Sequence, residues 1–362
     1  KDLFYSRSRN YSGYRAKALF SENISEEVYD NLIESVHQNL KPLYKYFEIR
    51  KKLLGLDELH AYDCSVPLVK NIKWHMPYEE AVEKIKIALQ PLGAEYNELV
   101  GKGLLQDRWT DRYENKGKRS GAYSSGCYDS NPFILMNYTE DNINSVYTLA
   151  HEAGHSMHSL YSRKNQPYLY SDYTIFVAEV ASTFNESLLT KFFLSQDIDR
   201  EMRVYLLCRE IDNFRGTLYR QTMFAEFEHK VYEAAENNQP LTIETFQEIY
   251  KGLLDLYFGP GLVLDDCLSL ECFRIPHFYF SFYVYKYATG ISAAYALADR
   301  VLSGGDKELD DYLNFLKSGG SKYPIDLLKG AGVDMTSPEP VRTALSKFSS
   351  LVDELESLTL EN

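Results

Sequence analysis

The segment 150–158 reads AHEAGHSMH, and its residue types and spacing are those of a metal site. His151 and His155 are four residues apart, so on a helix their imidazoles project from the same face, one turn apart. Two imidazole nitrogens placed in this way can bind one Zn²⁺ ion. Glu152 can then reach a water molecule on the metal and accept its proton. The spacing therefore predicts metal-assisted hydrolysis of a peptide bond.

A chance occurrence of the same letters is the alternative. The chain contains 8 histidines in 362 residues, which makes a random H-E-x-x-H on the order of a one-in-a-hundred event. Residues 144–150 extend the helical pattern upstream, as the motif requires. Gly154 is costly in a helix interior, and we expect it where another segment must approach the helix closely. These features favour a metal site over a purely structural role.

A zinc site of this kind needs a third protein ligand and an open position for water. His158 is one candidate, but three ligands from one straight helix cannot easily surround a metal tetrahedrally. Glu179 is the favoured candidate, because it lies in a second, otherwise apolar helical segment where an unpaired carboxylate is expensive to bury. Glu186, two turns further on, is either a solvated charge or a partner that orients a zinc-bound histidine.

A lone histidine lies among aromatic residues in the segment 274–290. Peptide hydrolysis builds negative charge on the former carbonyl oxygen, and a positioned Tyr O–H or His N–H can stabilise that charge. His277, Tyr283 and Tyr285 are the candidates for this role. An aromatic-rich helix that only fills the core is the alternative.

Helical periodicity dominates the rest of the chain. A different segment, 117–131, is rich in Gly, Ser, Tyr and Asn, and it is followed by a short apolar strand over 132–138. The edge of this strand is predicted either to bind an extended peptide or to belong to an ordinary small sheet. The predicted helical stretches cover residues 25–55, 77–109 with a break at Pro91, 199–237, 242–257, 278–302, 307–317 and 338–358.

Composition narrows the class of protein. The net charge of −13 argues against nucleic acid and anionic membrane surfaces as partners. The 5 cysteines are scattered without metal or disulfide spacing, which indicates free thiols in a reducing compartment, so we expect a cytoplasmic protein. There is no apolar run near twenty residues and no signal-peptide pattern.

Several segments together resemble bacterial oligoendopeptidase F, a branch of the thimet-oligopeptidase-like zinc metallopeptidases. They are residues 121–124, the strand 132–138, the motif 151–158, the segment 176–186 and the aromatic stretch 275–290. The resemblance implies a mainly α, zincin-like metallopeptidase domain with a small β-sheet beside the active-site helix. It also implies two lobes around a deep substrate channel, with residues 1–362 forming one large helical catalytic region.

In the family pattern, one zinc ion per chain is held by the positions that fall on His151, His155 and Glu179. The catalytic glutamate falls on Glu152, and the substrate-contacting histidine and tyrosines fall within 277–287. Family members carry a further helical segment ahead of what is Lys1 here, so we expect this chain to be the catalytic portion without that segment.

The sequence therefore predicts a zinc-dependent endopeptidase that cleaves short peptides. Two alternatives stay open. One is a related exopeptidase, a peptidyl-dipeptidase or carboxypeptidase, in which a cation such as Arg274 holds a terminal carboxylate. The other is an inactive zinc-bearing module that binds peptides. The sequence predicts no oligomeric state.

Overall fold

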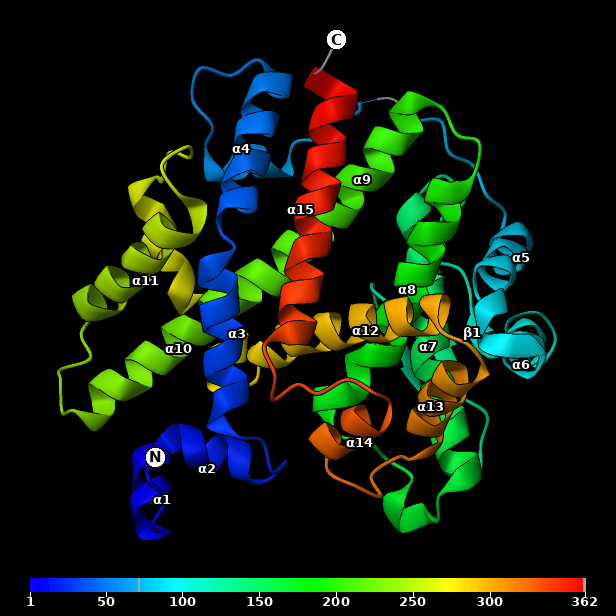
Figure 1. The fold of residues 1–362 in the computed structure, drawn as a ribbon, viewed down its shortest axis with the longest axis horizontal. Helices are drawn as coiled ribbons and strands as arrows, with labels where there is room; N and C mark the ends of the chain where they lie inside the picture. Colours follow the sequence, from blue (N-terminus) through cyan, green and yellow to red (C-terminus); the bar gives the residue numbers. More distant parts are fainter. Residues whose placement is uncertain (71, 361–362) are drawn as a thin grey trace. The chain divides into compact units, whose positions relative to one another are not determined.

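The computed structural model describes residues 1–70 and 72–360 (Figure 1). Within these residues the chain is built mainly from helices, with one three-stranded sheet, so the predicted fold class is confirmed. The chain divides into two compact units. The first comprises residues 1–70, 200–289 and 335–362, and the second comprises residues 71–199 and 290–334.

The first unit assembles helices from three parts of the chain. In it α15 packs along α4 and α9, as Figure 1 shows. Its elements are α1 (Asp2–Ser8), α2 (Tyr14–Phe20), α3 (Glu26–Gln38), α4 (Lys41–Leu54), the 3-10 turn η1 (Ala61–Ser65), α9 (Arg200–Phe214), the π-helical turn η4 (Arg215–Tyr219), α10 (Arg220–Glu236), α11 (Ile243–Phe258), the 3-10 segments η5 (Asp266–Phe273) and η6 (Pro276–Tyr279), the start of α12 (Tyr285–Ser303), and α15 (Glu339–Leu360).

Local sequence signals account for where these helices begin and end. Ser25 caps α3, and its side chain accepts a hydrogen bond from the backbone N–H of Glu27. The single helix predicted over 25–55 is interrupted after Gln38, and Pro42 lies in the first turn of the next helix, where proline is tolerated. Gly55 ends α4 at a left-handed φ of 67°, which glycine adopts without strain.

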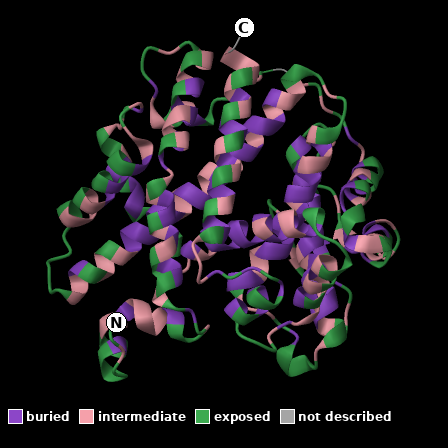
Figure 2. Cartoon of the chain, in the orientation of Figure 1, coloured by how far each residue is buried: buried purple, intermediate pink, exposed green. Residues whose placement is uncertain are grey.

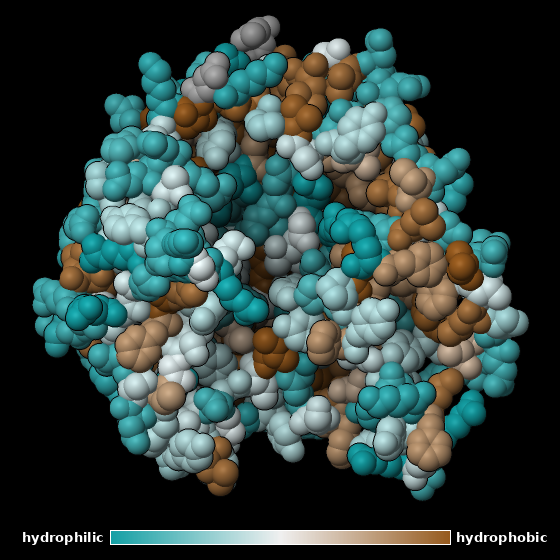
Figure 3. Space-filling view, turned by 180° about the vertical axis from the view of Figure 1, so that it is seen from behind, coloured by the Kyte–Doolittle hydropathy of each residue, from teal (hydrophilic) through white to brown (hydrophobic). Residues whose placement is uncertain are grey.

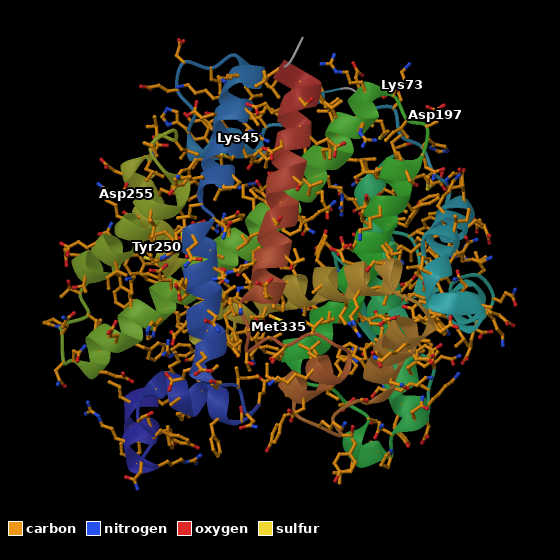
Figure 4. All side chains as sticks on the ribbon, in the orientation of Figure 1. Lys45, Lys73, Asp197, Tyr250, Asp255 and Met335 are labelled. Carbon is orange, nitrogen blue, oxygen red and sulfur yellow. The ribbon has the colours of Figure 1, made fainter. Side chains whose placement is uncertain are left out.

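Side-chain contacts tie distant parts of the first unit together (Figure 4). Lys45 on α4 forms ion pairs with Asp353 and Glu356 of α15, at 2.7 and 2.6 Å. Tyr250 on α11 donates a hydrogen bond of 2.7 Å to the carboxylate of Glu271 in η5. The exposed ion pairs contribute little, so apolar packing supplies most of the stability of this unit.

The second unit contains the helix that carries the H-E-x-x-H motif. That helix, α7, packs along α8 and also contacts α13 and the strands β2 and β3. Figure 2 colours α7 and α8 largely as buried. The elements of this unit are α5 (Tyr78–Ala88), the 3-10 turn η2 (Gln90–Leu92), α6 (Gly93–Leu105), β1 (Thr110–Asp111), β2 (Tyr123–Ser125), β3 (Phe133–Leu135), α7 (Ile143–Asn165), the 3-10 turn η3 (Tyr168–Tyr170), α8 (Ile175–Ser195), the rest of α12, α13 (Asp306–Lys317) and α14 (Pro324–Gly330).

The small sheet corrects one prediction. Its strand order is β1-β3-β2, with β3 parallel to β1 and antiparallel to β2. The strand predicted over 132–138 is therefore the central strand, and both of its edges are already paired. The free edges of this sheet belong to β1 and β2, so only these two strands can receive an added peptide strand.

Most of the predicted helices are present within the described residues, including the break at Pro91 between α5 and α6. The helix predicted to begin at residue 278 is wrong at its start, because α12 begins at Tyr285 after a 3-10 turn and an irregular segment. The short helices α1, α2 and α14 were not predicted, since each has 7 residues and too few turns to show a periodicity.

Hydrophilic side chains cover much of the face shown in Figure 3, with separate hydrophobic patches between them. The prediction of free thiols is confirmed, since all five cysteines are unpaired. Within residues 1–70 and 72–360, no helix combines the length and the apolar character needed to cross a membrane.

Candidate metal and catalytic site

The two motif histidines converge on one point beside α7. The Nε2 atoms of His151 and His155 lie 3.1 Å apart, and the ring planes are inclined at 83°. Asn142 caps the start of this helix, where its side chain accepts a hydrogen bond from the backbone N–H of Asn144. Two ring nitrogens that approach each other in this way, with no other group between them, have the arrangement of two ligands to one ion.

Glu179 on α8 completes the group. Its Oε2 atom lies 3.3 Å from His151 Nε2 and 3.6 Å from His155 Nε2. Among the described residues, these three side chains form the group whose donor atoms, all within 4.8 Å of one another, could hold a metal ion. Two imidazoles and a carboxylate are the donor set that zinc accepts in hydrolytic sites. The residues therefore fit the metal that the sequence motif predicts.

Gly154 explains how α8 comes close enough to deliver this carboxylate. A Cβ atom at position 154 would lie 2.6 Å from the carbonyl oxygen of Ala181 and from the Cα of Ser182, distances that real Cβ contacts do not show. The amide of Asn185 also donates a hydrogen bond of 3.2 Å to the carbonyl of Ala150. The prediction that the motif glycine permits a close approach is confirmed.

Glu186 holds one of the two imidazoles in place. Its Oε1 atom lies 2.7 Å from Nδ1 of His151. When the ring is neutral, this contact keeps its proton on Nδ1 and leaves the Nε2 lone pair directed at Glu179 and His155. Of the two possibilities for Glu186, a solvated charge and an orienting partner, the geometry favours the partner.

The electrostatics of the group favour a cation. Burial lowers the pKa of His151, but hydrogen bonds with Glu179 and Glu186 outweigh burial and raise it to about 10. Burial raises the pKa of Glu179, but hydrogen bonds with His151 and His155 outweigh burial and hold it well below its usual range. Surroundings that hold a proton this strongly on His151 stabilise positive charge, which a divalent cation would supply.

Glu152 lies beside the group with an unsatisfied oxygen. Its side chain is 6% exposed, and its Oε2 atom is buried without a hydrogen-bond partner among the described residues. Burial raises the pKa of this carboxyl. The charges of His151 and His155, and to a lesser extent a hydrogen bond from the backbone of Ser124 in β2, partly oppose the rise. A hydroxyl contact of 2.8 Å between Ser124 and Ser156 also ties β2 to α7. A buried carboxylate with a free oxygen and a raised pKa has the properties of a general base.

His158, the other candidate for the third ligand, is excluded from the group. Its ring stacks on Tyr173 with a centroid distance of 3.6 Å, and its side chain is 1% exposed. Burial, and to a lesser extent the charge of His155, lower its pKa to about 3. His158 is therefore a neutral core residue, and Glu179 is the candidate that lies with the two motif histidines.

The aromatic candidates of 274–290 lie in the first unit and differ in exposure. The rings of His277, Tyr283 and Tyr287 cluster at centroid distances of 5.9, 6.0 and 5.5 Å. Tyr285 instead is 0% exposed and packs against Tyr29 in the core. Its hydroxyl has no surface with which to meet a substrate, so the inclusion of Tyr285 among the site residues has no structural support.

Sequence reasoning missed two residues of these clusters. Tyr287 lies within the segment considered but was not singled out. It follows Tyr283 by four positions, but α12 begins only at Tyr285, so a helical spacing could not be assumed between the two tyrosines. Ser124 contacts Glu152 through its backbone. A contact made by a main-chain group cannot be predicted from a pattern of side chains.

A mainly helical chain with H-E-x-x-H on one helix and a converging glutamate on the next has the organisation of the helical zincin-like metallopeptidases. Residues 2–347 match peptidase family M3, and the chain belongs to that family. The resemblance inferred from the motifs is confirmed.

Named relatives share most of this chain. It is 51% identical over 361 residues to "Oligopeptidase PepF" of Bacillus subtilis, covering 100% of this chain and 54% of that protein. It is 44% identical over 358 residues to "Oligoendopeptidase F homolog" of Borreliella burgdorferi, covering 99% of this chain and 61% of the relative. The crystal structure of oligoendopeptidase-F from Enterococcus faecium superimposes with a TM-score of 0.78 at 36% identity, covering 99% of this chain and 57% of that one. The chain thus spans a little over half the length of these relatives.

Proposed function

We propose that this chain is the catalytic part of a zinc-dependent endopeptidase that hydrolyses short peptides. One observation carries the proposal. The nitrogens of His151 and His155 and a carboxylate oxygen of Glu179 converge on one point, next to the unpartnered buried oxygen of Glu152. Membership of peptidase family M3 and the printed names of the relatives support the same activity.

The proposed mechanism assigns a task to each of these side chains. His151, His155 and Glu179 would hold one zinc ion, which when bound supplies Lewis acidity toward water and toward the peptide carbonyl. Glu152 accepts a proton from the attacking water on Oε2 and later transfers it to the leaving amine. Its raised pKa brings it closer to the working pH, which favours both transfers.

His277 and Tyr283 are proposed to stabilise the negative charge that develops on the carbonyl oxygen. Both can donate a hydrogen bond, and their rings lie 5.9 Å apart in one cluster. Their segment forms part of the first unit.

The edge of β2 is proposed to align the peptide. Its other side is paired with β3, and the backbone of its central residue, Ser124, contacts Glu152. An extended peptide added to this edge would gain main-chain hydrogen bonds next to the general base. This mode accepts many side chains, as expected of an enzyme that degrades short peptides.

Glu152→Gln tests the proposal. Gln keeps the size of the side chain but cannot take up a proton, so we expect zinc content to be retained and cleavage of a fluorogenic peptide to fall by about 10³-fold or more. Turnover by the variant at the wild-type rate would contradict the role of Glu152. Wild-type protein treated with a chelator is the matched control for loss of the metal alone.

Two further measurements distinguish the alternative functions, an exopeptidase and an inactive peptide-binding module. Mass spectrometry of products from unlabelled peptides distinguishes internal cleavage from removal of terminal residues. Arg274, the cation considered for a terminal carboxylate, is already paired with Glu271, which does not favour an exopeptidase. Zinc-loaded wild-type protein that binds peptides without cleaving them would identify an inactive binding module.

The proposal also includes the setting of the enzyme. Five free thiols are compatible with a reducing compartment, and we propose the cytoplasm. The proposed partners are peptides, with neither nucleic acid nor membranes among them, in keeping with the net charge of −13.

A further inference from the structure

The segment between η6 and α12 has an unusual backbone. Residues 278–284 were predicted to be helical, but the helix begins only at Tyr285. Phe282 adopts a left-handed conformation with φ of 55°. A bulky residue with positive φ is strained, and it persists only where its surroundings impose that conformation.

A buried carboxyl group holds this strained residue. The backbone N–H of Phe282 donates a hydrogen bond of 2.6 Å to Oε1 of Glu228 on α10. The ring of Phe282 packs against Tyr14, Tyr29 and Tyr232, with centroid distances of 5.8, 5.5 and 5.2 Å. The ring packing fixes the side chain, while the Glu228 hydrogen bond satisfies the main-chain group that the left-handed turn buries.

The Glu228–Phe282 hydrogen bond lies next in sequence to the aromatic cluster of the proposed site. Tyr283 follows Phe282 directly, and its ring lies 5.9 Å from that of His277. A peptide unit that rotates at residue 282 necessarily moves the Cα–Cβ direction of Tyr283. Loss of the Glu228–Phe282 hydrogen bond would therefore change where the Tyr283 ring lies relative to His277.

Glu228 is buried without a compensating charge. It is 4% exposed, its Oε2 atom has no hydrogen-bond partner among the described residues, and no cation among them is near enough to lower its pKa. A cavity of about 400 Å³ beside it is lined mostly by apolar and aromatic side chains such as Phe227 and Phe278. The titratable groups that face it are Asp2 of α1, Tyr29 of α3, Tyr285 of α12, Tyr232 of its own helix and, around the cavity, Cys272 and Tyr279.

These surroundings favour the neutral carboxyl. Burial raises the pKa of Glu228 to about 8, the hydrogen bond from Phe282 partly opposes the rise, and the charge of Asp2 adds to it. Glu226 lies on the same helix and is also buried, at 6% exposed, but its pKa is shifted in the opposite direction. Burial raises its pKa, but its partners His37, Tyr257 and Lys230 outweigh burial and lower it. The contrast makes Glu226 a natural control.

The geometry points to Glu228 as a positioning residue for the reaction, which acts through the Phe282 amide on the placement of His277 and Tyr283. This inference rests on the proposed function, because it assigns Glu228 a task by way of those two side chains. Glu228 touches neither substrate nor metal in this assignment. Glu228 contributes by holding residues 280–284 in their observed conformation.

Amide hydrogen exchange over residues 276–285 tests the inference without any need for activity. Glu228→Gln keeps an acceptor oxygen for the Phe282 N–H, and Glu228→Ala removes it. We expect exchange in this segment to rise several-fold in Glu228→Ala and to stay at the wild-type level in Glu228→Gln at pH 6. Glu226→Gln, the control on the same helix, should leave this segment unchanged.

Kinetics provide the second readout. We expect kcat for peptide cleavage to fall by about 10²-fold in Glu228→Ala, with zinc content unchanged, and to be restored in Glu228→Gln.

Two results would overturn the inference. One is wild-type exchange of residues 276–285 in Glu228→Ala. The other is a loss of overall stability in Glu228→Ala with no change confined to this segment. If the wild type cleaves no peptide, the proposed function fails, and the exchange experiment still decides the anchoring role.

Discussion

Glu152 and Glu179 carry the same chemical group, yet their surroundings push their pKa values in opposite directions. Burial raises that of Glu152, and contacts with His151 and His155 lower that of Glu179 in spite of burial. The first is suited to exchange a proton with water and the second to remain an anionic ligand. Position relative to the two imidazoles, rather than residue type, separates the proposed base from the proposed ligand.

His158 provides a prediction at the residue scale. Its folded-state pKa of about 3 lies below the ordinary value of 6.5. Between these values the unfolded chain binds a proton that the folded chain refuses, so stability is lost as the pH falls from about 6.5 toward 3. The lost contribution approaches about 5 kcal/mol. His158→Phe keeps a ring against Tyr173 and removes the titration.

We therefore expect the midpoint of thermal unfolding to fall less steeply with acid in His158→Phe than in the wild type. Circular dichroism melts at a series of pH values measure this difference. Parallel acid profiles for the two proteins would show that His158 does not contribute to acid unfolding.

At the scale of elements, the α7–α8 contact sets the geometry of the site. Gly154→Ala would place a methyl group 2.6 Å from backbone atoms of α8. Since a backbone cannot swing aside as a side chain can, α8 must move and carry Glu179 with it. We expect a loss of stability of about 1–3 kcal/mol from overpacking, together with at least about 10-fold weaker zinc binding. Thermal melts and competition with a chelator measure the two effects.

Gly252→Ala is the matched control for this substitution. Gly252 lies in α11, and a Cβ there meets nothing within 4 Å. Alanine in place of glycine within a helix should raise stability by roughly 0.5–1 kcal/mol and leave zinc binding unchanged. Equal losses of zinc affinity in both variants would show that the close approach of α8 is not the cause.

Local patterns predicted most of these elements and could not predict others. His151, Glu152 and His155 are detectable because their spacing repeats with the helix, and Glu179 because it interrupts an apolar segment. The apolar and aromatic composition of the segment 278–284 predicts a buried helix. Its actual conformation depends on Glu228, a residue about fifty positions earlier whose contact with Phe282 exists only in the folded chain. Likewise, the central position of β3 depends on partners that the strand's own sequence does not specify.

At the scale of the whole molecule, metal binding should contribute to folding. The three proposed ligands converge only in the folded chain, so a zinc ion held by them would bind the folded state in preference to the unfolded one. At a free zinc concentration 100-fold above Kd, we expect about 2.7 kcal/mol of added stability. Calorimetry with zinc and with chelator measures it. His155→Ala should lose the zinc-dependent increase, and an equal increase in that variant would place the metal elsewhere.

The proposed metal site lies within a short segment of the chain, and this affects the order in which the molecule folds. All the side chains proposed to hold or orient the ion fall between positions 151 and 186, on two helices consecutive in the chain. The first unit, by contrast, joins positions as distant as Lys45 and Asp353. Contacts of low sequence separation form sooner than those that must close long loops. The α7–α8 hairpin should therefore be among the earliest structures along the folding pathway, with the metal-binding geometry in place before the first unit is assembled.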